Sequence, residues 1–185
     1  MKRTIFAAMA AAALLAGGQA GAGALYWDGN GATAPNPSGS GTWDASTTPN
    51  WEPCDVLPAG LRPDAVGAAV VAGTSTVTVS GTVQVNEMRF TQASGVTYTF
   101  TGGTIQLTGS GLIGASANTL GVTLNINTTL SGSVGVNFDT RQVVNLNAPA
   151  NYTGNTTINT GGGAVTLNVN NALPVGTIVQ AGPMG

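Results

Sequence analysis

The sequence predicts an all-β protein built as a parallel β-helix, a solenoid with coils of about 20 residues, on the basis of composition and periodicity. Gly contributes 28 of 185 residues, charged residues only 6%, and Thr, Asn, Ser and Val fill much of the rest. Thr and Val favour pleated, half-buried surfaces, whereas Gly and Asn favour turns with positive φ. A hydrophobic content of 42% supplies a core, which argues against a disordered chain. Short alternating runs also return at a near-constant interval, and this second observation selects the solenoid.

The alternating runs begin near Val70, and their apolar and polar residues follow a period of two. The clearest run is TVTVSGTVQV (Thr76 to Val85), and VTYTF (Val96 to Phe100) and TIQLT (Thr104 to Thr108) continue the pattern. This period is typical of strands that bury one face. Gly-rich pairs separate the runs, as expected for tight turns between short strands.

Matched apolar residues recur once per run, and they define the predicted coils. These residues are Val83, Ile105, Leu124, Leu146 and Leu167, at intervals of 22, 19, 22 and 21 positions. Successive coils of a solenoid lie at the strand spacing of about 4.8 Å, so equivalent residues stack. We therefore expect these five residues to form one inward aliphatic column.

The residue after each member of that column is an amide, which predicts a second, outward column. Its members are Gln84, Gln106, Asn125, Asn147 and Asn168. Stacked amides can hydrogen-bond to one another along the axis. A β-sandwich or jelly roll is the alternative interpretation, because it too has short alternating strands, but it does not require matched residues every twenty positions.

Residues 1–24 are interpreted as a signal peptide. Lys2 and Arg3 form a positive start, an apolar stretch covers Thr4 to Leu15, and small residues lead to a cleavage position after Ala24. The apolar stretch is shorter than the ~20 residues that span a bilayer. The sequence therefore predicts a protein that is secreted or placed on the outer surface of a bacterium.

Residues 25–69 differ in composition from residues 70–185, which form the predicted repeat body. The first of these zones holds all three tryptophans, Trp27, Trp43 and Trp51, and most of the prolines. We interpret it as an irregular cap, because the first coil of a solenoid exposes an unpaired strand edge that must be covered. Two alternatives remain open: the tryptophans form an aromatic platform for glycans, or Asp28, Asp44 and Asn30 bind calcium.

The remaining polar residues predict no catalytic, metal or cofactor site. Downstream of Ala24 only Arg62, Arg89 and Arg141 are basic, against seven acidic residues, which excludes a nucleic-acid footprint. Cys54 has no His or Lys downstream of the signal to activate it. Glu87 and Asp139 are the acidic residues of the repeat body, 52 positions apart, and are expected in non-equivalent phases of the repeat. A carbohydrate-binding or carbohydrate-active (lyase-like or hydrolase-like) β-helix using them is the alternative function.

Two segments resemble a known family of exported proteins. NYTGNTTINTGGGAVTLNVNNALPVGT (Asn151 to Thr177) resembles the autotransporter-associated β-strand repeat, from which it departs at Gly162-Gly163-Ala164, which add residues before the next strand. YWDGNG (Tyr26 to Gly31) with GTWDASTTPNW (Gly41 to Trp51) is similar to the start of large proteins that carry such repeats. The resemblance implies a right-handed β-helical passenger with an adhesive or structural role and no catalytic residues.

Such passengers are usually longer than this chain and end in a membrane-embedded barrel or a sorting signal. The resemblance therefore leads us to expect an N-terminal portion of a longer protein, truncated at the C-terminus. Expected partners are host or environmental glycans or surfaces, with end-to-end or lateral self-association as a further expectation. Attachment to a membrane would run only through an anchor that follows this portion.

Overall fold

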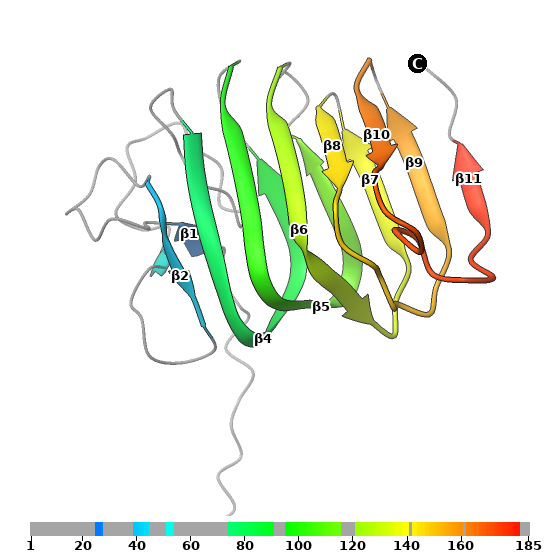
Figure 1. Cartoon of the computed structure of the whole chain (residues 1–185), viewed down its shortest axis with the longest axis horizontal. Coiled ribbons are helices and arrows are strands. Elements are labelled where there is room, and N and C mark those ends of the chain that lie inside the picture. The colour runs from blue at the N-terminus through cyan, green and yellow to red at the C-terminus, as the bar shows by residue number, and fades with distance from the viewer. Residues whose placement is uncertain are drawn as a thin grey trace, which may run out of the picture.

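The computed structural model describes residues 25–27, 39–44, 51–53, 74–90, 95–115, 121–140, 142–160 and 162–181, and these residues form strands and connecting turns without a helix (Figure 1). The strands are β1 (Leu25–Trp27), β2 (Gly41–Trp43), β3 (Trp51–Pro53), β4 (Thr74–Phe90), β5 (Thr97–Ala115), β6 (Thr123–Gly132), β7 (Val136–Thr140), β8 (Val143–Leu146), β9 (Thr156–Thr160), β10 (Ala164–Leu167) and β11 (Val179–Ala181).

The strands from β4 onward form a parallel β-helix, as predicted. Every strand pair within this body is parallel, and the strand order β10-β8-β6-β5-β7-β9-β11 joins segments one coil apart. The alternative of a sandwich, with antiparallel neighbours on facing sheets, is therefore wrong. Figure 1 shows the coils side by side along the long axis, from β4 to β11.

Each coil has three sides. β4 and β5 each bend at two places, where the register between them shifts, and these bends separate the sides. The first side consists of 74–79, 97–102, 123–127, β8 and β10, with β2 added beside β4. The second side consists of 82–85, 104–107 and 129–132. The third side consists of 87–90, 112–115, β7, β9 and β11.

The predicted aliphatic column is correct at both ends and wrong in the middle. Val83 stacks on Ile105, and Leu146 stacks on Leu167. Ile105, however, continues to Leu130 on the second side, whereas Leu124 lies on the first side between Tyr98 and Val144. The five residues therefore belong to three inward columns.

The physical reason is that the coils differ in length. On the first side, Thr74, Thr97, Thr123, Val143 and Ala164 are in register at intervals of 23, 26, 20 and 21 positions. The second coil is longest, mainly because Thr108–Gly111 stand between its second and third sides, where the first coil has only Asn86. The backbone N–H of Ser110 donates to Oδ1 of Asn86 at 2.9 Å, which anchors the longer turn. A constant interval therefore assigns Leu124 to the wrong side.

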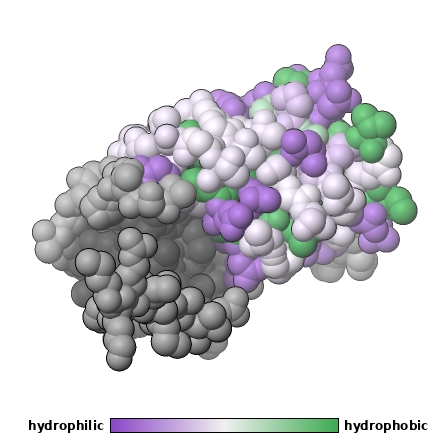
Figure 2. All heavy atoms as spheres, turned by 90° about the horizontal axis from the view of Figure 1, so that it is seen from below, coloured by the Kyte–Doolittle hydropathy of each residue, from purple (hydrophilic) through white to green (hydrophobic). Residues whose placement is uncertain are grey.

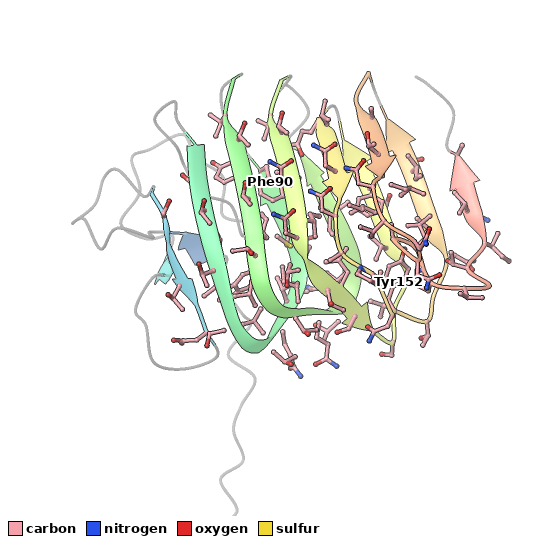
Figure 3. All side chains as sticks on the ribbon, in the orientation of Figure 1. Phe90 and Tyr152 are labelled. Atoms are coloured by element: carbon pink, nitrogen blue, oxygen red, sulfur yellow. The ribbon has the colours of Figure 1, made fainter. Side chains whose placement is uncertain are left out.

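The inward residues of all three sides meet in one core. It contains Phe90, Tyr98 and Phe100, whose ring centroids lie 5.5 Å (Phe90–Tyr98) and 6.1 Å (Phe90–Phe100) apart in tilted and edge-on arrangements. Figure 3 shows Phe90 inside the coils. Aromatic pairs at these separations add to the stabilisation that comes from burial alone.

The last described coil leaves part of this core open. Leu167, beside buried Leu146, is 51% exposed, and Val179 of β11 is 50% exposed. Among the described residues no strand pairs with the outer edge of β10 or β11. The described residues also contain no helix that is both long and apolar enough to cross a bilayer.

Only part of the tryptophan-rich zone lies within the described residues. β1 and β3 pair antiparallel, with Trp27 opposite Trp51, whereas β2 pairs in parallel with Val77–Val79 of β4 and extends the first side. The expected signal peptide (1–24) and the 69/70 boundary lie outside the described residues.

We expect the fold to lose stability above about pH 10, which is the ordinary pKa of a tyrosine phenol. Burial raises the pKa of Tyr98, which is 1% exposed, and burial also raises the pKa of Tyr152, although the hydrogen bond between Tyr152 and Thr156 opposes that shift. A raised pKa means that the unfolded chain releases these protons first. The two tyrosines therefore contribute fully to the free energy of unfolding below pH 10. Above it, each tyrosine lowers this free energy by up to about 1.4 kcal/mol for every pH unit.

Urea unfolding of the wild type and Tyr98→Phe between pH 8 and 11.5 measures this dependence. The variant should have the smaller loss of unfolding free energy above pH 10. Equal slopes for the two proteins would contradict the assignment to Tyr98.

Candidate functional site

The outward residues of the first side form an uncharged, ordered surface, which we call the Thr/Asn face. Its members alternate with inward-facing residues along the chain and are Thr76, Thr78, Thr97, Thr99, Thr101, Thr123, Asn125, Asn127, Val143, Asn145, Asn147, Ala164, Thr166 and Asn168. Twelve of these fourteen residues are Thr or Asn, and none is charged. The strands that carry them lie side by side in Figure 1. The face therefore presents rows of hydroxyls and amides with few other groups.

Asparagine ladders order the later half of this face. Asn145 donates from Nδ2 to Oδ1 of Asn125 at 2.9 Å, and Asn125 donates to Oγ1 of Thr99 at 3.4 Å. In the neighbouring column Asn168 donates to Asn147, and Asn147 donates to Asn127, both at 2.7 Å. Every donation runs toward the N-terminal coil, so each ladder fixes its amides in one orientation.

The predicted amide column also needs a correction. Asn147 and Asn168 do stack, and Gln84 donates from Nε2 to Oε1 of Gln106 at 3.0 Å. The glutamines, however, lie on the second side, and Asn125 stacks on Asn145 in a column of its own. The five predicted residues therefore belong to three outward columns, and the cause is again the longer second coil.

We expect Asn147→Ala to lower the free energy of unfolding by about 1–2 kcal/mol, because it removes two ladder bonds of about 1 kcal/mol each. Asn147 donates to Asn127 and accepts from Asn168. Asn151→Ala is the matched control, because this exposed side chain belongs to none of the ladders. Urea denaturation should separate the two variants, and an equal effect would show that the ladder adds nothing.

The acidic residues of the repeat body stand apart from this face, on the third side. Glu87 is in register with Leu112 and Asn137, whereas Asp139 is in register with Gly114 and Arg89. The two carboxyl-bearing positions are thus two residues and two coils apart, which separates their backbones by about 12 Å. Glycosidases place their two carboxyl groups about 5–9.5 Å apart.

Glu87 accepts a hydrogen bond at its Oε2 from Oγ of Ser110, at 3.3 Å in the next coil. Arg89 and Asp139 occupy equivalent register positions on either side of Gly114. Arg141 lies outside the described residues. Glu87 and Asp139 therefore occupy non-equivalent backbone positions of the repeat, as the sequence predicts.

The structure describes the side chain of Trp43 and the backbone of Trp27 and Trp51. Trp43 ends β2 and packs into the hydrophobic core with 6% of its surface exposed. Trp27 and Trp51 are register partners in the antiparallel β1–β3 pair. Glycan contact through the tryptophans stays a prediction, and Trp43 offers little ring surface for it.

The proposed ion ligands are only partly described. Asp44 follows β2, whereas Asp28, Asn30 and Cys54 lie outside the described residues. Within the described ranges no group of three or more His, Cys, Asp or Glu residues gathers around one point.

A buried hydroxyl chain lies at a corner of the later coils. The phenol of Tyr152, which is 2% exposed, lies 2.6 Å from Oγ1 of Thr156, and Thr156 lies 3.2 Å from Oγ1 of Thr177. Thr177 donates to the backbone oxygen of Gly154 at 2.9 Å, so the chain ends on a carbonyl. Figure 3 shows Tyr152 in this part of the molecule. The hydroxyls satisfy one another, so the corner is structural.

Searches against family models, curated proteins and solved structures give no match to this chain.

The Thr/Asn face was not predicted as a site from the sequence, although the sequence contains the pattern that forms it. The threonines alternate in Thr76-x-Thr78 and Thr97-x-Thr99-x-Thr101, and the asparagines in Asn125-x-Asn127 and Asn145-x-Asn147. These alternating residues predict the Thr/Asn face when they are taken as successive rows of one surface. A single amide per coil does not predict it.

Proposed function

We propose that the protein is exported and acts as a structural, adhesin-like β-helical rod, secreted or on the outer surface of a bacterium, without catalysing a reaction. The observation that carries this proposal is the stack of coils bound together by ladders beneath an uncharged, hydrogen-bonding outer face. A body in which each coil hydrogen-bonds to the next along the axis resists bending, and its polar face is available for contact. The signal-like N-terminus and the resemblance to passenger repeats support the same proposal.

Export is tested by expressing the full chain in a bacterium with an outer membrane and sequencing the N-terminus of the extracellular or surface-bound protein. We expect the recovered chain to begin at Leu25. The variant Leu14→Arg, which interrupts the apolar stretch, should stay inside the cell with an intact N-terminus. Recovery of the wild type only from the cytoplasm, with Met1 retained, would overturn the proposed export.

The absence of catalysis is tested with a panel of soluble and crystalline polysaccharides, using release of reducing ends or unsaturated sugars as the readout. We expect no turnover from the wild type. Glu87→Gln is the deciding variant, because Glu87 is the one carboxylate of the predicted coils whose side chain the structure describes. Turnover by the wild type that this variant abolishes would replace the structural role with a carbohydrate-active one.

A further inference from the structure

The Thr/Asn face is a two-dimensional lattice of hydrogen-bonding groups. One column runs Thr76–Thr99–Asn125–Asn145–Thr166, and the next runs Thr78–Thr101–Asn127–Asn147–Asn168. Members of one column lie one strand spacing apart, about 4.8 Å, and neighbouring columns lie two residues apart along the strand, about 6.6 Å. The register is unbroken across the five strands, and backbone hydrogen bonds from Asn147 to Ile126 and from Asn168 to Leu146 continue it past the ends of β8 and β10. Both spacings therefore persist over the face.

The side chains of this lattice are held in place before any ligand arrives. Asparagine ladders orient Asn125, Asn127, Asn145 and Asn147, and the β-branched threonines have restricted χ1 angles. Little conformational entropy is left to lose on binding, which favours a rigid partner. A small mobile ligand would reach only one or two of these groups. A ligand that engages the whole face at once has to repeat in two dimensions, as a crystalline surface does.

The dimensions of the lattice approach those of ice. Water molecules in hydrogen-bonded contact lie about 2.75 Å apart, and tetrahedral geometry then places second-neighbour oxygens about 4.5 Å apart and repeats hexagonal layers after about 7.3 Å. The face, with about 4.8 Å and 6.6 Å, agrees with these distances to about a tenth. The mismatch is about 0.3 Å along a column and about 0.7 Å between columns, and the range of hydrogen-bond lengths takes up part of it.

The chemistry of the face also suits a water lattice. A threonine hydroxyl both donates and accepts hydrogen bonds, and an asparagine amide keeps a second N–H and a second lone pair outside its ladder, so each can stand in for a lattice water. A charged side chain would order water around itself in a different geometry, and the face has none.

A crystalline polysaccharide is the main competitor, and the composition of the face disfavours it. Sugar rings present apolar patches that pack on aromatic side chains, whereas none of the fourteen members of the face is aromatic. Trp43, beside the first coil, is buried in the core. The geometry points to ice: the Thr/Asn face of the first side is an ice-binding surface. This function is independent of export and display, because it needs only the folded coils.

The test is a comparison of the purified full chain with two variants in ice recrystallisation and thermal hysteresis assays. Thr101→Tyr places a bulky ring on the face, in the second column between Thr78 and Asn127. Thr157→Tyr makes the same change at an outward position of the third side, in register with Asn137 and Gln180, where the column is not a Thr/Asn lattice. Circular dichroism melting of both variants confirms that they fold.

We expect the wild type and Thr157→Tyr to slow ice recrystallisation and shape ice crystals at equal concentrations. Thr101→Tyr should need about a tenfold higher concentration to slow recrystallisation equally, because losing one to two hydrogen bonds to the lattice has an effect of that order. Wild-type behaviour no different from that of an inert protein such as albumin would overturn the inference. Full activity in folded Thr101→Tyr, or binding to crystalline cellulose or chitin but not to ice, would overturn it as well. None of these results bears on export, which is measured in cells.

Discussion

Leu124→Asp is expected to abolish cooperative folding of the repeat body. Leu124 is fully buried on the first side, between Tyr98 of the preceding coil and Val144 of the following one. A carboxylate in this column would have apolar neighbours above and below. An unpaired buried charge costs several kcal/mol, which is comparable with the total stability of about 5–15 kcal/mol of a typical domain.

Asn125→Asp is the matched control, because the same group is introduced one residue later on the outward side. It alters the ladder bonds with Thr99 and Asn145 but leaves the core intact, so the loss should be about 1 kcal/mol. Urea unfolding followed by circular dichroism measures both variants. A cooperative transition of Leu124→Asp near that of Asn125→Asp would show that Leu124 does not face the core.

Gly135→Ala is expected to cost about 3 kcal/mol, near the upper end for overpacking, because the added methyl group would meet backbone. The Cβ would overlap the carbonyl oxygen of Asn155 in the next coil and lie 3.0 Å from the Asn155 nitrogen. That carbonyl cannot move away without cost, because it accepts the backbone N–H of Val136 at 2.9 Å. The coils can therefore approach this closely only if position 135 has no side chain.

Gly81→Ala separates this steric effect from simple loss of a glycine. A Cβ at Gly81 would have no atom within 4 Å, and only its φ of 71° opposes substitution. Strain of that kind costs about 1–2 kcal/mol. Differential scanning calorimetry should therefore give Gly135→Ala the larger drop in Tm. The reverse order would contradict the close approach of the coils at this corner.

The sequence was sufficient for the architecture, because the pattern that builds a β-helix is local and repeated. Alternation in TVTVSGTVQV sets which residues point inward, and recurrence every twenty or so positions sets the stacking. The pairs Val83–Ile105 and Leu146–Leu167 follow from it directly. The antiparallel alternative fails because the strands from β4 onward pair in parallel with segments one coil away.

The register could not be predicted throughout, because coil length is set at the corners and the corners carry little periodicity. Thr108–Gly111 lengthen the second coil by an amount that depends on the turn geometry and on the bond from Ser110 to Asn86. An apolar residue on one side and another on the next side look alike in sequence, as Ile105 and Leu124 do. The hydrogen-bonded hydroxyls of Tyr152, Thr156 and Thr177 were not predicted for the same reason, because two of these residues lie outside strands.

The candidate site could likewise be predicted only in part. The asparagines were expected to stack, and they do, but the correct partners require the correct register. The Thr/Asn face is a property of several coils together, so it is visible only after the coils are aligned. The expected roles of Trp27, Trp51 and Asp28 depend on side chains that lie outside the described part of the structure, and they stay predictions.

The stacking of coils in the observed register is tested most directly by cysteine pairs in a Cys54→Ser background. Asn125→Cys combined with Asn145→Cys joins register neighbours, whose Cα atoms at about 4.8 Å lie within the 4.4–6.8 Å range that disulfides span. Asn125→Cys combined with Gln106→Cys joins residues that a constant interval would align but that the structure places on different sides. Under mild oxidation we predict rapid disulfide formation in the first pair and none in the second. The opposite result would contradict the register and, with it, the Thr/Asn face.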